Sequence, residues 1–174
     1  MMYILSNLGY DRGMKNIIAL CAVASLFLSG CSLVPVRDKD VQKEEVKYVN
    51  TEYGFSVALP ESWNGFSVVN ESWEGIELDS LSSAKVLGPK ISIRHPLWTA
   101  QTPRQDIPVM IFTPAQWDLV LQEKLSLGAA PIGPSELARN TNYIFALPAR
   151  YNYAFPEGFE EVKQIIDNKS VSAF

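Results

Sequence analysis

The chain has 174 residues, of which 47% are hydrophobic and 20% are charged, and it carries a formal net charge of −4. This composition can bury a core, which excludes a wholly disordered chain. The mildly acidic balance argues against nucleic acid or an anionic lipid surface as the main partner.

A short apolar run near the N-terminus predicts export. Residues 17–28, IIALCAVASLFL, follow Met14 and Lys15 and lead into small residues. A positive residue, a short apolar stretch and small residues make up a secretory signal peptide, and the run is shorter than the about 20 apolar residues of a membrane-spanning helix. We therefore interpret residues 1–30 as a signal peptide whose natural start is Met14, with a buried core helix as the alternative.

The residues that end this segment, LSGC at 28–31, resemble the lipobox of bacterial lipoproteins. The resemblance implies that the thiol of Cys31 receives a diacylglycerol and that the chain is cut just before this residue. Cys21 lies inside the predicted signal peptide, so no disulfide is expected in the mature chain. The implied location is extracytoplasmic, with a lipid anchor in the bacterial cell membrane or outer membrane.

The next segment is predicted to be a tether. Residues 33–52 are densely charged and polar and show no wide apolar stripe, so they bury too little surface to order themselves. We expect residues 31–52 to be a flexible tether that begins with the lipidated cysteine, with a solvated helix as the alternative. Residues 53–174 are then one globular domain, which is long enough for a single core.

Strands dominate the first part of this domain. Alternating or continuous apolar residues predict strands, and Gly and Pro predict their ends. The predicted strands cover residues 54–60, 65–69, 74–80 (the weakest), 90–95, 107–113 and 142–149, with a turn at Gly88–Pro89. The segment at 107–113 is almost wholly apolar and is therefore predicted to be central in the sheet.

Two helices are predicted later in the chain. The first starts with Thr113 as cap and Pro114 in the first turn, and Gly128 closes it; its apolar face is formed by Trp117, Val120, Leu121 and Leu125. Residues 127–143 are predicted to be a stiff loop with a short helical turn from Ser135 to Arg139. The second helix follows Pro156, with an apolar side formed by Phe159, Val162, Ile165 and Ile166. We expect an α+β fold, a mostly antiparallel sheet covered by helices.

Residues 51–63, TEYGFSVALPESW, resemble the opening hairpin of PsbP-like domains, the α+β fold shared with Mog1. In this hairpin Gly54 lets the chain turn, Pro60 ends the strand and Trp63 plugs the edge of the sheet. The resemblance implies an extracytoplasmic accessory or binding protein. Photosystem binding is not implied, because no functional residue of that photosystem subunit is matched.

Catalytic and metal chemistry find little support. His95 is the only histidine, and neither a Gly-x-Ser-x-Gly elbow nor a free cysteine accompanies it, so we expect it to be structural. The same scarcity of ligands argues against zinc. The acids Glu71, Glu74, Glu77 and Asp79 lack the spacing of a calcium loop and are expected on a solvated strand face. We expect no metal, cofactor or catalytic residue, although a carboxylate pair for glycoside chemistry stays open.

Arginine and aromatic residues gather on segments that lack periodicity. Arg supplies a planar fork for carboxylate or phosphate, and an aromatic ring supplies a stacking face. The candidate binding residues are Arg94, His95, Trp98, Arg104, Arg139, Arg150, Tyr151 and Tyr153. The alternative is local, with each Arg holding a loop by pairing with a nearby acid or ring.

Three functions therefore compete. We favour a tethered, non-enzymatic binding or accessory module, whose partners are the lipid bilayer through Cys31 and a small anionic or polar ligand or an envelope protein. No nucleic acid is expected. The alternatives are an envelope hydrolase that uses His95 or a carboxylate pair, and a purely structural envelope protein.

Overall fold

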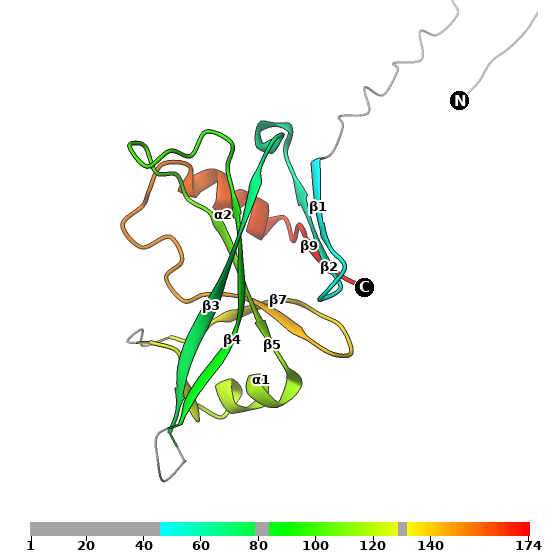
Figure 1. Ribbon diagram of the computed structural model, residues 1–174, viewed down its shortest axis with the longest axis vertical. Coiled ribbons are helices and arrows are strands. Elements are labelled where there is room, and N and C mark those ends of the chain that lie inside the picture. Colours follow the sequence, from blue (N-terminus) through cyan, green and yellow to red (C-terminus); the bar gives the residue numbers. More distant parts are fainter. Residues whose placement is uncertain (1–45, 79–83, 129–131) are drawn as a thin grey trace, which may run out of the picture. The chain divides into compact units, whose positions relative to one another are not determined.

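The computed structural model describes residues 46–78, 84–128 and 132–174 (Figure 1). Its elements are, in chain order, β1 (Val46–Asn50), β2 (Phe55–Leu59), the 3-10 turn η1 (Glu61–Trp63), β3 (Ser67–Glu77), β4 (Lys85–Arg94), β5 (Ile107–Phe112), α1 (Pro114–Leu121), β6 (Leu125–Ser126), β7 (Ser135–Arg139), β8 (Ile144–Leu147), α2 (Phe159–Asp167) and β9 (Val171–Ala173). The expected α+β class with a mostly antiparallel sheet is confirmed. Cys31, the predicted signal peptide and the predicted tether up to residue 45 lie outside the described residues.

The strands form two antiparallel sheets. One has the order β1-β2-β9 and the other the order β6-β3-β4-β5-β8-β7. The main core lies between the inner faces of both sheets and α2. Its buried residues are Phe55, Val57, Leu59, Trp63, Ile91, Ile93, Ile107, Val109, Ile111, Phe145, Val162, Ile165 and Val171. The last helix therefore packs through Val162 and Ile165, as its spacing predicts.

A second apolar cluster lies under α1, with Trp73, Met110, Phe112, Trp117, Leu125, Ile144 and Ala146 as its buried members. Figure 1 shows α1 and α2 near opposite ends of the long β3–β4 pair. The predicted start of α1 is confirmed, because the hydroxyl of Thr113 accepts from the N–H of Gln116 at 3.2 Å and Pro114 occupies the first turn. The predicted end near Gly128 is wrong.

The helix ends early because the chain turns back toward the sheet. The N–H of Lys124 donates to the carbonyl of Leu119 at 2.8 Å, and Glu123 takes a positive φ of 58°. Leu125 consequently pairs in β6 with β3, and Leu121, expected on the apolar face, is 65% exposed.

The boundary of the folded part differs from the prediction at Tyr53. Residues 46–50, placed in the expected tether, form β1 and pair with β2 from Val46↔Leu59 to Asn50↔Phe55. Val46 and Tyr48 pack against the core while Lys47 is exposed. This alternation was masked by the charged residues that precede it in the sequence.

The predicted break inside β3 and the predicted turn at Gly88–Pro89 are wrong. Residues 67–77 form one strand, and Gly88 and Pro89 lie inside β4, opposite Trp73 and Ser72. A β-carbon at Gly88 would lie 2.3 Å from the ring of Trp73. This glycine therefore makes room for an indole on the neighbouring strand instead of turning the chain.

The predicted short helical turn from Ser135 to Arg139 is also wrong. These residues form β7, which pairs with β8 across a register shift between Glu136 and Ala138. Strand β9 was not predicted. The predicted strands around 55–59, 107–112 and 144–147 are confirmed, and β5 is central in its sheet.

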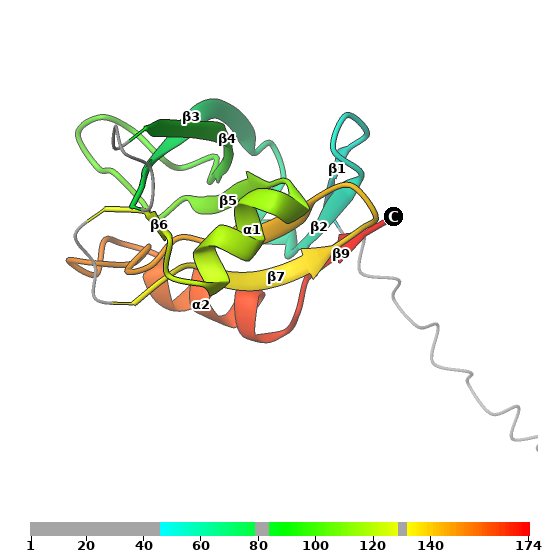
Figure 2. The same cartoon turned by 90° about the horizontal axis from the view of Figure 1, so that it is seen from below.

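The two sheets are joined on one side only. The side-chain amide of Asn140, after β7, donates to the carbonyls of Tyr53 at 2.9 Å, Gly54 at 3.2 Å and Phe174 at 3.3 Å. On the opposite side β1 and β3 are the outer strands, and Figure 2 shows both along the same side. Within residues 46–78, 84–128 and 132–174, no helix is both long and apolar enough to cross a bilayer.

Candidate functional site

The predicted binding residues occupy separate places. The β4–β5 and β8–α2 connections meet at one end of the larger sheet, where Arg104 forms an isolated β-bridge with Glu157 and the N–H of Gln105 donates to the carbonyl of Glu157 at 2.8 Å. Arg94, His95, Trp98, Arg104, Arg150, Tyr151 and Tyr153 belong to these two connections or to the strand end beside them. Arg139 lies apart from them on β7.

Arg94 is held by a carboxylate and a ring. Its guanidinium donates to Asp106, with 2.8 Å from Nη2 to Oδ2 and 3.2 Å from Nε to each carboxylate oxygen. The guanidinium carbon also lies 4.0 Å from the ring centre of Trp98. The hydrogen bonds to Asp106 raise the pKa of Arg94 above its ordinary value. The guanidinium fork and the aromatic stacking surface, which the sequence suggested for ligand binding, are therefore both occupied by contacts within the chain.

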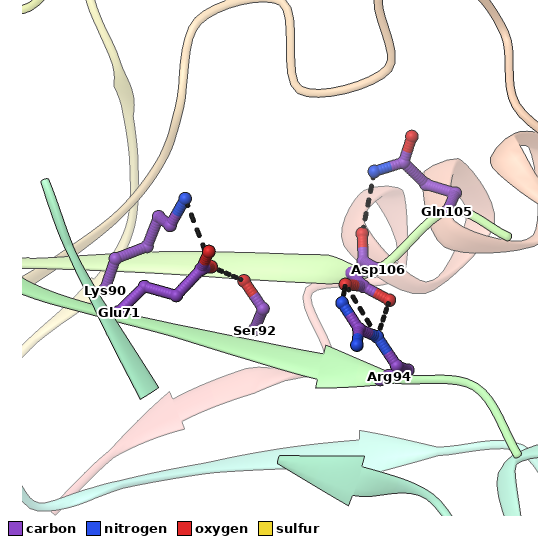
Figure 3. A network of polar contacts seen from close by, with 6 residues as sticks. All are labelled: Glu71, Lys90, Ser92, Arg94, Gln105 and Asp106. Carbon is purple, nitrogen blue, oxygen red and sulfur yellow. Dashed lines mark hydrogen bonds and ion pairs between the residues drawn. The ribbon is translucent and has the colours of Figure 1, made fainter. Parts of the chain in front are cut away.

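Glu71, Lys90 and Ser92 extend this pair into a polar strip across β3, β4 and β5 (Figure 3). Lys90 lies 3.2 Å from Glu71, whose carboxylate also accepts from the hydroxyl of Ser92 at 3.0 Å. Burial raises the pKa of Glu71, but the hydrogen bonds from Lys90 and Ser92 outweigh it, so the pKa lies below its usual value. Each charge in the strip is matched, which leaves no surplus for a charged ligand.

His95 is 4% exposed. Its Nδ1 accepts the N–H of Leu97 at 3.1 Å, its Nε2 lies 3.9 Å from a carboxylate oxygen of Glu161, and its ring meets Trp63 edge-on at 5.0 Å. Burial lowers the pKa of His95, Arg104 lowers it further, and the nearby glutamates only partly offset this. The imidazole is neutral near pH 7 and its described hydrogen bond is local.

The other arginines differ in their partners. Arg104 pairs with Glu157, and Arg139 pairs with Glu136 on its own strand, with Nε 2.6 Å from the carboxylate. Arg150 lies 6.0 Å from the ring centre of Tyr153. These pairs match the local alternative for Arg104 and Arg139, and ligand binding by the arginines stays a prediction.

Around Arg150 the β8–α2 connection forms a shallow hollow of about 450 Å³, lined also by Asn152, Tyr153, Ala154 and Phe155. Tyr153 and Phe155 are exposed, whereas Tyr151 is partly buried against the main core. Burial raises the pKa of Tyr151. The β8–α2 connection therefore places one of its aromatic rings, that of Tyr151, against the core and leaves those of Tyr153 and Phe155 at the surface.

A larger cleft of about 640 Å³ lies where the two sheets are not joined. It runs between β1, with its turn to β2, and the inner face of β3 and β4, and we call it the β1–β3 cleft. Its lining residues are Tyr48, Asn50, Glu52, Tyr53, Val68, Asn70, Glu71, Ser72, Leu87, Gly88, Pro89, Lys90 and Ile91. None of the eight arginine, histidine and aromatic residues predicted to bind lines it.

The cleft combines apolar surface with uncharged polar groups, and its charged lining residues are Glu52 and the paired Glu71 and Lys90. Leu87, which faces Glu74 across the strand pair, is 53% exposed, and Val68, which faces Ile93 further along the pair, is also exposed. Asn50 is engaged, since its amide donates to the hydroxyl of Tyr48 at 2.8 Å. The side chains of Asn70 and Ser72, in contrast, make no hydrogen bond within the described part of the chain. They are free to bond a ligand.

Sequence reasoning missed this cleft for two reasons. Tyr48 and Asn50 fell within the predicted tether, Pro89 fell within the predicted turn at Gly88–Pro89, and Leu87 fell beside that turn. The period-two alternation of Val68, Asn70 and Ser72 was a usable signal for one strand face. The pairing of that face with β1 is not visible in any local pattern.

In the part of the chain that the structure describes, no group of three or more His, Cys, Asp or Glu residues is placed to hold a metal ion. Compared with protein-family models, curated proteins and solved structures, the chain shows no match. Any functional assignment therefore depends on the chain's own residues.

Proposed function

We propose that this protein is an extracytoplasmic lipoprotein whose folded part is a PsbP/Mog1-like binding module, and that the β1–β3 cleft is its binding site. The observation that carries the binding role is the cleft itself, about 640 Å³ in volume and lined by exposed apolar and unbonded polar side chains. Clefts of this size with a few polar groups are the usual binding sites of proteins.

The chemistry of the lining favours a polar, largely uncharged ligand. Lys90 and Glu71 neutralise each other at one wall, so a charged ligand would compete with an existing ion pair. Val68, Leu87 and Asn70 offer apolar contact and an amide. This shifts the expected ligand away from the anionic class that the arginines suggested.

Binding without chemistry is favoured over hydrolysis. The Nδ1 of His95 already accepts the N–H of Leu97, and the ring is almost fully buried. A general base needs a free ring nitrogen within reach of the proton that it removes. Neither nitrogen of His95 opens into the cleft, since His95 does not line it.

The family part of the proposal is supported by the opening hairpin. Gly54 has a φ of 78°, where a β-carbon would also meet the carbonyl oxygen of Phe174 at 2.7 Å. Strand β2 ends before Pro60, and Trp63 is buried in the main core. These are the roles that the PsbP-like resemblance assigns to Gly54, Pro60 and Trp63.

The binding role is tested by nuclear magnetic resonance on the ¹⁵N-labelled protein. Polar small molecules and short peptides are titrated to about 1 mM, the weak end of useful affinity. We expect shifts at Tyr48 and Asn70 that are lost in Leu87→Arg, because the new charge occupies the cleft. Leu121→Arg is the matched control, since Leu121 is exposed and lies outside the cleft. Absence of any hit, or hits that persist in Leu87→Arg, would refute the site.

The lipid anchor is tested in a bacterial host with radiolabelled palmitate. Cys31→Ser is expected to lose the label and to accumulate as an uncut precursor. Cys21→Ser is the control, because Cys21 lies inside the predicted signal peptide, and it should label and mature normally. Labelling and cleavage of the Cys31→Ser variant at the same bond would show that the anchor is misassigned.

A further inference from the structure

The outer edge of β3 has no strand partner over most of its length. The N–H of Glu77 donates to Ala84 on the β4 side, and the N–H of the next residue, Leu78, donates to Lys124 on the β6 side. Because backbone groups alternate in direction along an antiparallel strand, every second residue before Leu78 also points outward. These outward residues are Ile76, Glu74, Ser72, Asn70 and Val68.

Strand β6 covers only the end of this edge. It pairs with β3 at Ile76 and Glu77. Among the described residues nothing pairs with the outward N–H and C=O groups of the other four positions, Val68, Asn70, Ser72 and Glu74. Buried or functional backbone groups are almost always paired in folded proteins, so four consecutive outward positions form a usable template for another strand.

Strand β1 presents a second free edge on the same side. The N–H of Ala58 donates to Ser170 at 2.9 Å, away from β1. Lys47 lies opposite Ala58, so its backbone groups point away from β2, and those of Val49 do the same. Among the described residues, the β1–β3 cleft is therefore bordered by two unpaired edges.

The β3 edge lacks the usual protection. Proteins shield free edges with charged side chains, especially lysine, with proline, with bulges or with a covering element. The β3–β4 register runs without a shift from Ser67↔Arg94 to Ile76↔Lys85. The acids of β3 contact lysines of β4, with Glu71 near Lys90 and Glu74 near Lys85 at 2.9 Å, and β3 itself carries no lysine or proline.

We propose that an extended peptide segment of a partner protein adds as a strand to the outer edge of β3 and places alternate side chains in the β1–β3 cleft. This rests on the proposed binding function and names its ligand class. The backbone groups of Val68, Asn70, Ser72 and Glu74 bind the peptide main chain, and the cleft selects small or apolar side chains that fit beside Val68 and Leu87.

A partner peptide fits this edge better than a second copy of the chain. Symmetric antiparallel pairing of all four outward positions sets Val68 against Glu74 and Asn70 against Ser72. Glu71 then lies directly opposite Glu71 of the second copy, and like charges directly opposite are destabilising. A hydroxyl-rich or basic peptide avoids this repulsion. An average strand of about six residues is long enough to pair with all four outward positions.

Amide hydrogen exchange of the full chain tests the geometry directly. In the free protein the amides of Val68, Asn70 and Ser72 should exchange at least about tenfold faster than those of Val69 and Glu71, which bond to β4. The probes are acetylated peptides of about six residues that alternate valine with serine or lysine. A binding peptide should slow the outward amides selectively, and N-methylation of only those peptide amides that face β3 should reduce its affinity at least about tenfold.

Variants at Ser72 provide the matched pair. Ser72→Pro removes an outward N–H without breaking a bond to β4, so it should fold and lose peptide affinity at least about tenfold. Ser72→Ala keeps the N–H and removes only the hydroxyl, so its peptide affinity should fall much less than that of Ser72→Pro. If Ser72→Pro does not fold, the N-methylated peptides still test whether the peptide main chain bonds to β3.

The outcomes separate the two proposals. Ligands that shift Tyr48 and Leu87 without slowing the β3 amides, with full binding by Ser72→Pro, overturn strand addition and leave the cleft as a binding site. Failure of every probe overturns both. If the outward amides are already protected in the free chain, the proposal that a partner peptide occupies the β3 edge is overturned. Protection that depends on protein concentration would identify a second copy of the chain as the occupant. Protection that does not depend on concentration would identify another segment of the same chain.

Discussion

Gly88→Ala is the sharpest test of how the cleft wall is built. A β-carbon at this position would lie 2.3 Å from Cε2 and Cζ2 of Trp73, whereas carbon atoms rest at about 3.5–4.0 Å. The indole cannot move aside freely. It is 4% exposed, lies 4.5 Å from the ring centre of Phe112 in a stacked arrangement, and donates from Nε1 to the carbonyl of Ile111 at 2.8 Å.

The expected change in the free energy of unfolding has two destabilising contributions and one stabilising contribution. Overpacking a filled site costs about 1–3 kcal/mol, and a buried donor that loses its acceptor costs about 1–3 kcal/mol more if the indole of Trp73 is displaced. Alanine recovers about 0.5–1 kcal/mol over glycine through lower chain entropy in the unfolded state. We therefore expect Gly88→Ala to lower the free energy of unfolding by about 3 kcal/mol.

Urea unfolding followed by circular dichroism measures this difference. Gly133→Ala is the control, because its nearest contact would be Val120 at an ordinary 4.0 Å, and it should stay within about 0.5 kcal/mol of the unaltered chain. Trp73→Leu should lower the free energy of unfolding less in the Gly88→Ala background than in the unaltered chain, because the clash with the indole is then already removed. A Gly88→Ala variant as stable as Gly133→Ala would refute the packing argument and would again favour the prediction of a turn at Gly88–Pro89.

Three further predictions concern the end of the sheet where the two connections meet. Trp63→Ala should lower the free energy of unfolding by about 3–5 kcal/mol in the same urea assay, because a fully buried ring is removed. Arg94→Lys should lower the melting temperature, since a point charge cannot replace the fork on Asp106; unchanged stability would favour a ligand role. Burial lowers the pKa of His95 in the folded state, so the stability present above about pH 6.5 should be lost as pH falls through the folded pKa. His95→Gln should flatten that acid-side loss, and an unchanged slope would contradict it.

Local patterns predicted the elements whose stabilising contacts are close in sequence. The cap at Thr113 contacts Gln116 three residues later, and the buried side of α2 repeats at helical spacing through Val162 and Ile165. The prediction of a turn at Gly88 was wrong because glycine occurs both in turns and where another group approaches the backbone closely. Only the position of Trp73 on the neighbouring strand distinguishes these two cases.

The same distinction applies to the predicted site. Arg139 and Glu136 are neighbours on one strand, so their ion pair was accessible from sequence. The acids that pair with Arg94 and Arg104 become apparent only when the β4–β5 and β8–α2 connections are placed in space. The β1–β3 cleft was harder still to predict from the sequence, because neither of its walls carries a chemical motif.

The asymmetry between the two sides of the fold bears on why the cleft can stay open. On the joined side one side-chain amide, that of Asn140 after β7, donates to the carbonyls of Tyr53, Gly54 and Phe174 in the small sheet. These bonds hold the small sheet against the large one without any contribution from β1 and β3 pairing with each other. The outer edges of β1 and β3 are then not required for folding, and their backbone groups are available to a ligand. A fold that closed on both sides would bury these groups in its own hydrogen bonds and would have no free edge to offer a partner strand.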